Sequence, residues 1–255
     1  TYLENPADSK EVTNFKILLL VLRSRDEMQE LNIEWLKNIY STKAVLREKM
    51  TLFWHDHFAT STQLAYLMQV QNNTLRKHAL GKFDKLLHAI STDPAMIIYL
   101  NNQQNKKDAP NENFAREVME LFTLGEGNVY TEHDIKEAAR AFTGWTVNKR
   151  GKFEFIADEH DEGEKEFLGI KGNFNGQDII NILLERKETA QYVTRKIYKE
   201  FVNEDVDEKI VEKLAADFFE SGYDISKLMK SIFTSGWFYS EKNVGSHIAS
   251  PVELS

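Results

Sequence analysis

Residues 46–60 read LREKMTLFWHDHFAT, and this stretch shows the pattern that decides the fold. Its apolar and aromatic residues recur at intervals of three and four, which places them on one face of an α-helix. The residues of that face are Leu46, Met50, Phe53 and His57. The stretch therefore predicts a helix with one buried face.

The same spacing continues through most of the chain, and only four prolines interrupt it. It predicts an all-α fold, a multi-helix globular domain. We expect helices over residues 10–23, 27–40, 43–59, 62–71, 82–92, 94–101, 112–124, 132–143, 176–186, 188–202, 207–221 and 225–235.

Residues 151–172, GKFEFIADEHDEGEKEFLGIKG, break the helical pattern. Phe153 and Phe155 alternate with polar residues, and a second short apolar segment follows an acidic turn. This alternation is typical of strands, so we expect a small inserted β-hairpin near residues 151–170.

The glycine-rich segment 151–176 is the best internal boundary, but it is too short to be a domain. We therefore expect residues 1–255 to form a single helical domain, with 151–176 as a hairpin and loop insertion. Ser250 and Pro251 match the start of a helix. We accordingly expect the domain to be truncated at the C-terminus, and a longer natural chain to unfold at a higher temperature.

Composition narrows the classes of partner and cofactor. The net charge of -8, with lysines interspersed among glutamates, disfavours nucleic acid. Because the chain has no cysteine, disulfides, thiolate catalysis, zinc–thiolate sites and iron–sulfur clusters are excluded, so any divalent metal must use nitrogen and oxygen ligands.

The apolar run 15–22 is too short to span a bilayer, so no transmembrane segment is expected. The first residues lack a signal-peptide pattern, which leaves the compartment undetermined.

His55 and His57 point about 200° apart on a helix, so they are not expected to chelate one ion. His57 lies on the apolar face and is expected to be more buried than His55. One interpretation makes His57 a packed, hydrogen-bonded side chain. The other makes one of the two a general base or a metal ligand, completed by a carboxylate from another helix.

Residues 101–125, NNQQNKKDAPNENFAREVMELFTLG, begin as an amide-rich loop and become a helix at about Glu112. The expected buried stripe of this helix is Phe114, Val118, Leu121 and Phe122. Glu117 flanks the stripe, where partial burial raises the pKa of a carboxyl group. It is therefore a candidate acid/base group or ligand.

Two sets of candidates follow from these segments, with a plain structural alternative. The catalytic candidates are His57, His55, Glu117 and Arg116, and the candidate ligands of a divalent metal are His57, Glu117 and Glu120. In the alternative, Arg116 and Glu120 form a surface ion pair and the asparagines serve turns and caps.

Residues 130–145, YTEHDIKEAARAFTGW, predict a further helix with Thr131 as its N-cap and Asp134 at the third helical position. Its polar residues are expected to face solvent; they are His133, Glu137 and Arg140. The acidic run 158–164 is expected to be a solvated turn or a cation-attracting one.

Several segments together resemble a bacterial family catalogued as domain of unknown function 1800. They are FWHDHFATS, HALGKFDKLLHAISTDPAMIIYLNNQQN, PNENFAREVMELFTLGEGNVYTEHDIKEAARAFTGW, HDEGEKEFLG and SPVEL. The resemblance covers about residues 45–255, and the first forty residues carry little of it.

The resemblance implies a setting rather than an activity, because the family has no established one. Its members are typically longer at the C-terminus, many resemble exported proteins, and they often occur beside proteins resembling the alkaline phosphatase and sulfatase superfamily. By analogy it implies a periplasmic or extracellular location, and either a partner of that superfamily or a polysaccharide.

Two functions remain open at this point. The first is a non-catalytic envelope or extracellular module that binds a partner protein or glycan through the loop 101–113. Its candidate binding residues are Asn105, Asn111, Asn113, Trp145, His160 and Asp161. The second is a hydrolytic enzyme, with or without a metal, that uses His55 or His57 with Glu117.

Overall fold

A computed structural model describes residues 10–127 and 129–246, with side chains from Arg23 onward. In these ranges eleven α-helices carry most of the chain, with two small antiparallel sheets of two strands each. The predicted mostly helical fold is confirmed. Ser250 and Pro251, expected to open a further element, lie outside the described residues.

Most helices follow the predicted segments within a few residues, but the helix predicted over 62–71 begins at Ala65 and continues to His78. The helices are α1 (Lys10–Ser41), α2 (Val45–His57), α3 (Ala65–His78), α4 (Phe83–Ser91), α5 (Pro94–Tyr99), α6 (Asn113–Glu117), α7 (Glu132–Ala141), α8 (Gly176–Leu184), α9 (Lys187–Phe201), α10 (Glu208–Glu220) and α11 (Ile225–Phe233). Short 3-10 turns and one π-helix complete them: η1 (Asn102–Gln104), η2 (Val118–Thr123), η3 (Ala157–Glu159) and η4 (Gly236–Tyr239).

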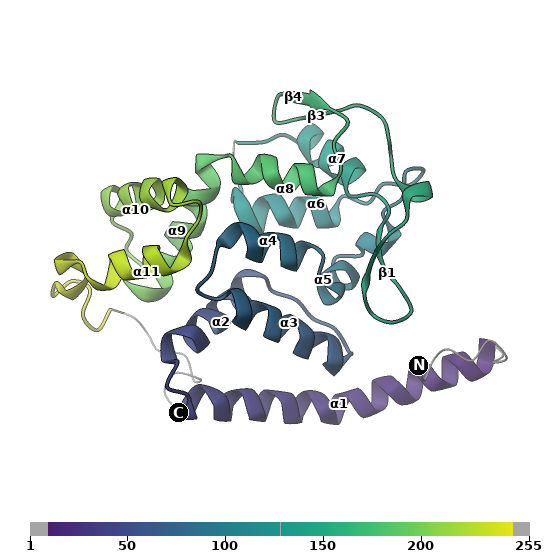
Figure 1. Ribbon diagram of the computed structural model, residues 1–255, viewed down its shortest axis with the longest axis horizontal. Helices are drawn as coiled ribbons and strands as arrows, with labels where there is room; N and C mark the ends of the chain where they lie inside the picture. The colour runs from purple at the N-terminus through teal and green to yellow at the C-terminus, as the bar shows by residue number, and fades with distance from the viewer. Residues whose placement is uncertain (1–9, 128, 247–255) are drawn as a thin grey trace.

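The helices lie in layers (Figure 1). The long α1 runs along one side of the molecule beneath α2 and α3. Helices α9, α10 and α11 gather at one end, β1 (Trp145–Val147) lies towards the other, and the β3–β4 hairpin (165–172) lies next to α7 at the top of the view. The separate helices predicted over 10–23 and 27–40 are one continuous helix, so that prediction was wrong at its boundary. Residues 24–26 are polar, but they contain neither proline nor glycine, so nothing in them ends a helix.

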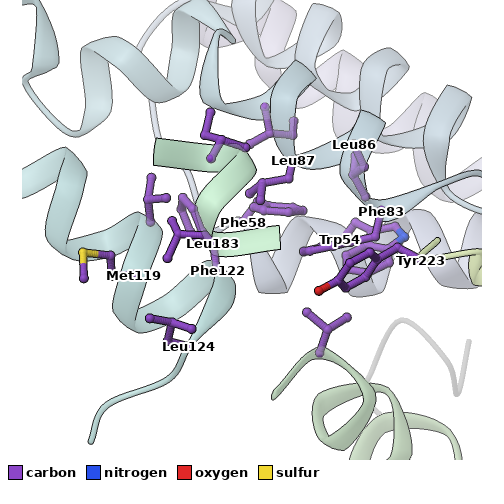
Figure 2. Packing of buried hydrophobic residues seen from close by; sticks show 14 of the residues in the cluster. Trp54, Phe58, Phe83, Leu86, Leu87, Met119, Phe122, Leu124, Leu183 and Tyr223 are labelled. Atoms are coloured by element: carbon purple, nitrogen blue, oxygen red, sulfur yellow. The ribbon is translucent and has the colours of Figure 1, made fainter. Parts of the chain in front are cut away.

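Helix α2 buries the predicted face. Met50, Phe53 and His57 are almost fully buried, as expected from their spacing. Phe58, just beyond the helix, lies with its ring centroid 5.0 Å from that of Phe122. Figure 2 shows these two rings side by side, with Trp54 next to them in the same cluster. This aromatic core joins α2 to α4 and η2.

The strands pair differently from the prediction. β1 (Trp145–Val147) pairs with β2 (Phe153–Phe155), and β3 (Lys165–Phe167) pairs with β4 (Ile170–Gly172). A strand around Phe153 was expected, but its partner precedes it instead of following it. The cause is a second turn: residues 168 and 169 have φ of 50° and 78°, which closes a two-residue hairpin loop of its own.

The N-terminus of α7 carries the predicted capping box. The Thr131 hydroxyl accepts a hydrogen bond from the Asp134 amide at 3.3 Å, and the Asp134 carboxylate accepts one from the Thr131 amide at 2.8 Å. Two otherwise unpaired helix-end donors are satisfied in this way.

Replacing Thr131 by alanine is expected to lower the free energy of unfolding by about 1 kcal/mol, the typical effect of losing a helix cap. Urea denaturation measures it. His133→Ala is the control, because His133 is exposed on the same helix and should change stability by less than about 0.5 kcal/mol. Equal effects of the two substitutions contradict the capping role.

Candidate functional site

The segment after α6 is a π-helix, η2, where an ordinary α-helix was expected to residue 124. The Leu124 amide donates to the Met119 carbonyl at 2.8 Å, five residues back. This wider turn changes which residues face the core. Leu121, predicted to be buried, is 42% exposed, whereas Phe122 is 2% exposed. Such turns are often found at functional sites.

His57 is bound to the end of this π-helix. Its Nε2 lies 3.2 Å from the Phe122 carbonyl oxygen, which can only accept, so Nε2 carries the proton. Nδ1 therefore holds a lone pair, is shielded from solvent, and has no hydrogen-bond partner among the described residues. Burial holds the pKa of His57 well below its ordinary value. The ring is a neutral imidazole with one nitrogen unused.

The sequence paired His57 with Glu117, and both line one cavity of about 410 Å³. We call it the histidine cavity; its other lining residues are Asp56, Ala59, Tyr99, Leu100, Asn113, Leu121, Phe122 and Lys196. His57 comes from α2, Glu117 from α6 and Lys196 from α9. Three segments distant in the sequence therefore converge here.

The ionisable groups of the histidine cavity are perturbed in the directions that burial dictates. Burial raises the pKa of Glu117, and the charge of Glu120 adds to the rise. Burial lowers the pKa of Lys196. The positive charge of Lys196 also contributes to the low pKa of His57. Lys196 was not predicted from the sequence, because lysines alternating with apolar residues on a helix ordinarily lie on its solvent face.

His55 lies on the other side of α2, against α1. Its ring centroid is 4.7 Å from that of Trp35, and burial lowers the pKa of His55 to about 4. His57 is the more buried of the two, as predicted. The two imidazoles have separate surroundings, in agreement with the helical geometry that argued against a chelating pair.

Arg116 is held by carboxylates. Its guanidinium lies 3.3 Å from Glu120, as the ion-pair interpretation predicts, and also pairs with Glu112 and Glu132. Across the described ranges no group of three or more histidine, aspartate or glutamate side chains could hold a metal ion. The predicted ligands His57, Glu117 and Glu120 therefore do not form such a group.

The asparagines of the loop 101–113 mostly form hydrogen bonds within the protein. Asn105 is 2% exposed, and its amide donates to the Ala139 carbonyl at 2.8 Å. Its oxygen accepts from the Asn111 amide at 2.9 Å. Asn113 donates to the Leu100 carbonyl at 3.1 Å and still lines the histidine cavity. These contacts fix the shape of the loop next to that cavity.

Glu137 and Arg140 were expected in solvent, and that expectation was wrong. Glu137 is only 9% exposed, and Arg140 binds it at 2.9 Å while also binding Asp161 at 2.7 Å. Glu137 accepts a further hydrogen bond from the Glu166 amide at 2.9 Å. The network fastens β3 to α7, and no helical periodicity could reveal it because its partners lie beyond residue 160.

Trp145 and His160 were both predicted as binding residues, and they meet in a second cavity of about 360 Å³. We call it the aromatic cavity; it is lined by Trp145, Phe153, Phe155, His160, Glu162, Asn173, Asn175 and Gln177. The two Phe residues, Asn173 and Asn175 come from the segment that had been expected only to form the hairpin and a loop, and Gln177 comes from the start of the helix predicted over 176–186.

Comparison with known proteins identifies the family. A family model described as "Protein of unknown function (DUF1800)" matches residues 4–255. The chain belongs to the DUF1800 family. The match extends the resemblance of residues 45–255 to nearly the whole chain. No curated protein and no solved structure matches significantly. In the described part of this DUF1800 chain, no helix combines the length and apolar character needed to cross a membrane.

Proposed function

We propose that this DUF1800 chain is a hydrolase whose acid–base site is the histidine cavity. One observation carries the proposal: His57, Glu117 and Lys196, from three separate helices, line the same cavity. The pKa of His57 is lowered and that of Glu117 is raised, so each shift favours the neutral form of its group. Such opposed perturbations are typical of catalytic acid and base groups.

The geometry supports a simple division of roles. His57 Nδ1 takes a proton from water, and the water oxygen bonds to an acyl carbon. The Lys196 ammonium group stabilises the negative charge that develops on the acyl oxygen. Glu117, in its protonated form, gives a proton to the departing oxygen as the acyl–oxygen bond breaks, and the imidazolium returns its proton to Glu117.

The lining of the histidine cavity favours an uncharged ester. With Glu117 protonated, the negative charge of Asp56 is balanced by the Lys196 ammonium group, so the cavity carries no net charge that would attract an ionic substrate. Tyr99 and Leu121 are 44% and 42% exposed and give it an apolar rim. Since Nδ1 is shielded from solvent, the side chains that cover it must move before it can reach a water molecule.

Hydrolysis of 4-nitrophenyl butyrate tests the proposal. His57→Gln and Glu117→Gln are each expected to lower kcat/KM about 100-fold, the usual contribution of one acid–base group. His133→Gln and Glu154→Gln are matched controls, because both side chains are exposed outside the cavity. The proposal fails if the chain is no faster than free imidazole, or if the cavity variants keep wild-type rates while folded by circular dichroism.

A non-catalytic module is the second candidate, favoured by the exposed segment 106–110 of the amide-rich loop. Such a module would bind a partner protein or a glycan through this segment. The family resemblance suggests a partner of the alkaline phosphatase and sulfatase superfamily and a periplasmic or extracellular location, and both belong to this alternative. Replacing Lys107 and Asp108 by serine separates the two functions. The double variant should weaken docking to a purified phosphatase-superfamily protein and leave ester hydrolysis unchanged.

A further inference from the structure

We infer that the aromatic cavity is a binding site for one neutral sugar ring of a glycan. This site is independent of the proposed hydrolase site, since the two cavities share no lining residue. It also differs from the loop expected to bind glycan, because its walls come from the β1–β2 hairpin, the turn after η3 and the start of α8.

The apolar wall is formed by rings held at steep angles. Trp145 pairs in register with Phe155, and Phe153 lies two residues away, so all three share one face of the hairpin. The rings of Trp145 and Phe153 are 5.2 Å apart at 83°. Phe155 and His160 are 5.3 Å apart at 69°, and Phe155 is 45% exposed. Phe155 therefore offers ring surface to the C–H face of a sugar.

Close packing behind the wall fixes its position. A Cβ at Gly176 would lie 2.4 Å from the Trp145 ring, so only glycine lets α8 begin there. Trp145 itself is 4% exposed. The wall is thus set before any ligand arrives, which reduces the entropy lost on binding.

The polar side of the cavity presents unused hydrogen-bonding groups. His160 is 5% exposed, and its Nδ1 donates to the Thr143 carbonyl at 3.0 Å, which leaves Nε2 as an acceptor. Within the described ranges, neither Nε2 nor the side-chain amides of Asn173 and Gln177 have a hydrogen-bond partner. Amides both donate and accept, as sugar hydroxyls do.

The charge and the volume of the aromatic cavity limit the classes of ligand that it can bind. Glu162 is the one charged residue in the lining and no cation accompanies it, which disfavours phosphate and sulfate groups. The volume of about 360 Å³ lies near the lower end for small-ligand pockets and fits one sugar ring. A quaternary ammonium ion also binds aromatic cages, but it cannot use the His160 acceptor and the amide donors. These polar groups favour the sugar.

Nuclear magnetic resonance of the 1–255 chain tests the inference. Cellobiose, maltose and N,N′-diacetylchitobiose are titrated separately, and at least one should shift the Trp145 indole N–H saturably. The Trp54 indole, which is buried in the core and bonded to the Ala79 carbonyl, should not move. Tetramethylammonium is titrated in parallel as the competing ligand class.

Phe155→Ala and Asn173→Ala should each weaken sugar binding about tenfold, consistent with the loss of one ring contact or one hydrogen-bonding pair. Ile170→Ala is the matched control, an apolar residue 43% exposed on the neighbouring hairpin, and should bind as the wild type does. The inference is overturned if no sugar shifts Trp145, if tetramethylammonium alone does so, or if both cavity variants bind normally. None of these outcomes bears on the proposed ester hydrolysis, which is tested separately at the histidine cavity.

Discussion

Replacing Arg76 by leucine is expected to lower the free energy of unfolding by about 3 kcal/mol, as when one partner of a buried ion pair is removed. The Glu48 side chain is 4% exposed, and Arg76 binds it through two nitrogens at 2.7 and 3.1 Å. Trp35 donates a further hydrogen bond to Glu48 at 3.3 Å. Without Arg76, a carboxylate stays buried between α1, α2 and α3 and loses the ion pair that the described residues give it.

Urea denaturation of matched variants measures this effect. Arg195→Leu is the control, since Arg195 pairs with Glu208 on the surface and both side chains are about half exposed; it should cost less than about 1 kcal/mol. Adding Glu48→Met to Arg76→Leu should restore most of the lost stability, because no charge is then left buried. A single-variant effect no larger than the control's would refute the argument.

Acidification from pH 7 to pH 4 is expected to remove about 3 kcal/mol of stability through His55 alone. Burial lowers the pKa of His55 in the folded state to about 4, whereas the unfolded value is 6.5. The unfolded chain therefore takes up the proton first. The contribution of His55 is fully present above about pH 6.5 and is lost as the pH falls towards 4. His57 acts in the same direction.

Asp93 opposes this loss, because burial raises its pKa to about 6 and the folded state takes up that proton first. The measurement must therefore compare the wild type with His55→Gln. In this variant the contributions of Asp93 and His57 to the pH dependence of the free energy of unfolding are unchanged. Over pH 7 to 4, the wild type should lose about 3 kcal/mol more than the variant. Parallel curves for the two proteins would mean that His55 is solvated in the folded state.

Local sequence patterns predicted the helices and the buried face of α2 because a periodicity of 3.6 residues is a property of one segment. The greater burial of His57 and the capping box at Thr131 follow from the same local rules. The continuity of α1 could not be predicted from periodicity, because the polar residues 24–26 interrupt the apolar pattern without ending the helix. Hairpin pairing was missed because the alternation of Phe153 and Phe155 marks a strand but does not say whether its partner precedes or follows it.

The candidate site was predicted in part. His57 and Glu117 could be named because each is a polar residue at the margin of an apolar stripe. Lys196 could not, since only the packing of α9 brings it next to α2. The network of Glu137, Arg140 and Asp161 was missed for the same reason: Glu137 and Arg140 are three residues apart on α7, but Asp161 lies 21 residues beyond Arg140.

The π turn at 118–123 makes the histidine cavity sensitive to chain length. Such a turn is related to an α-helix by one inserted residue, so deleting one residue there would restore the α-helical phase. Glu117 would then rotate by about 100° relative to Phe122. The residues of α2 and α4 that pack in the aromatic core lie outside this segment. Relatives that lack one residue in this segment are therefore expected to share the architecture and to have lost the site.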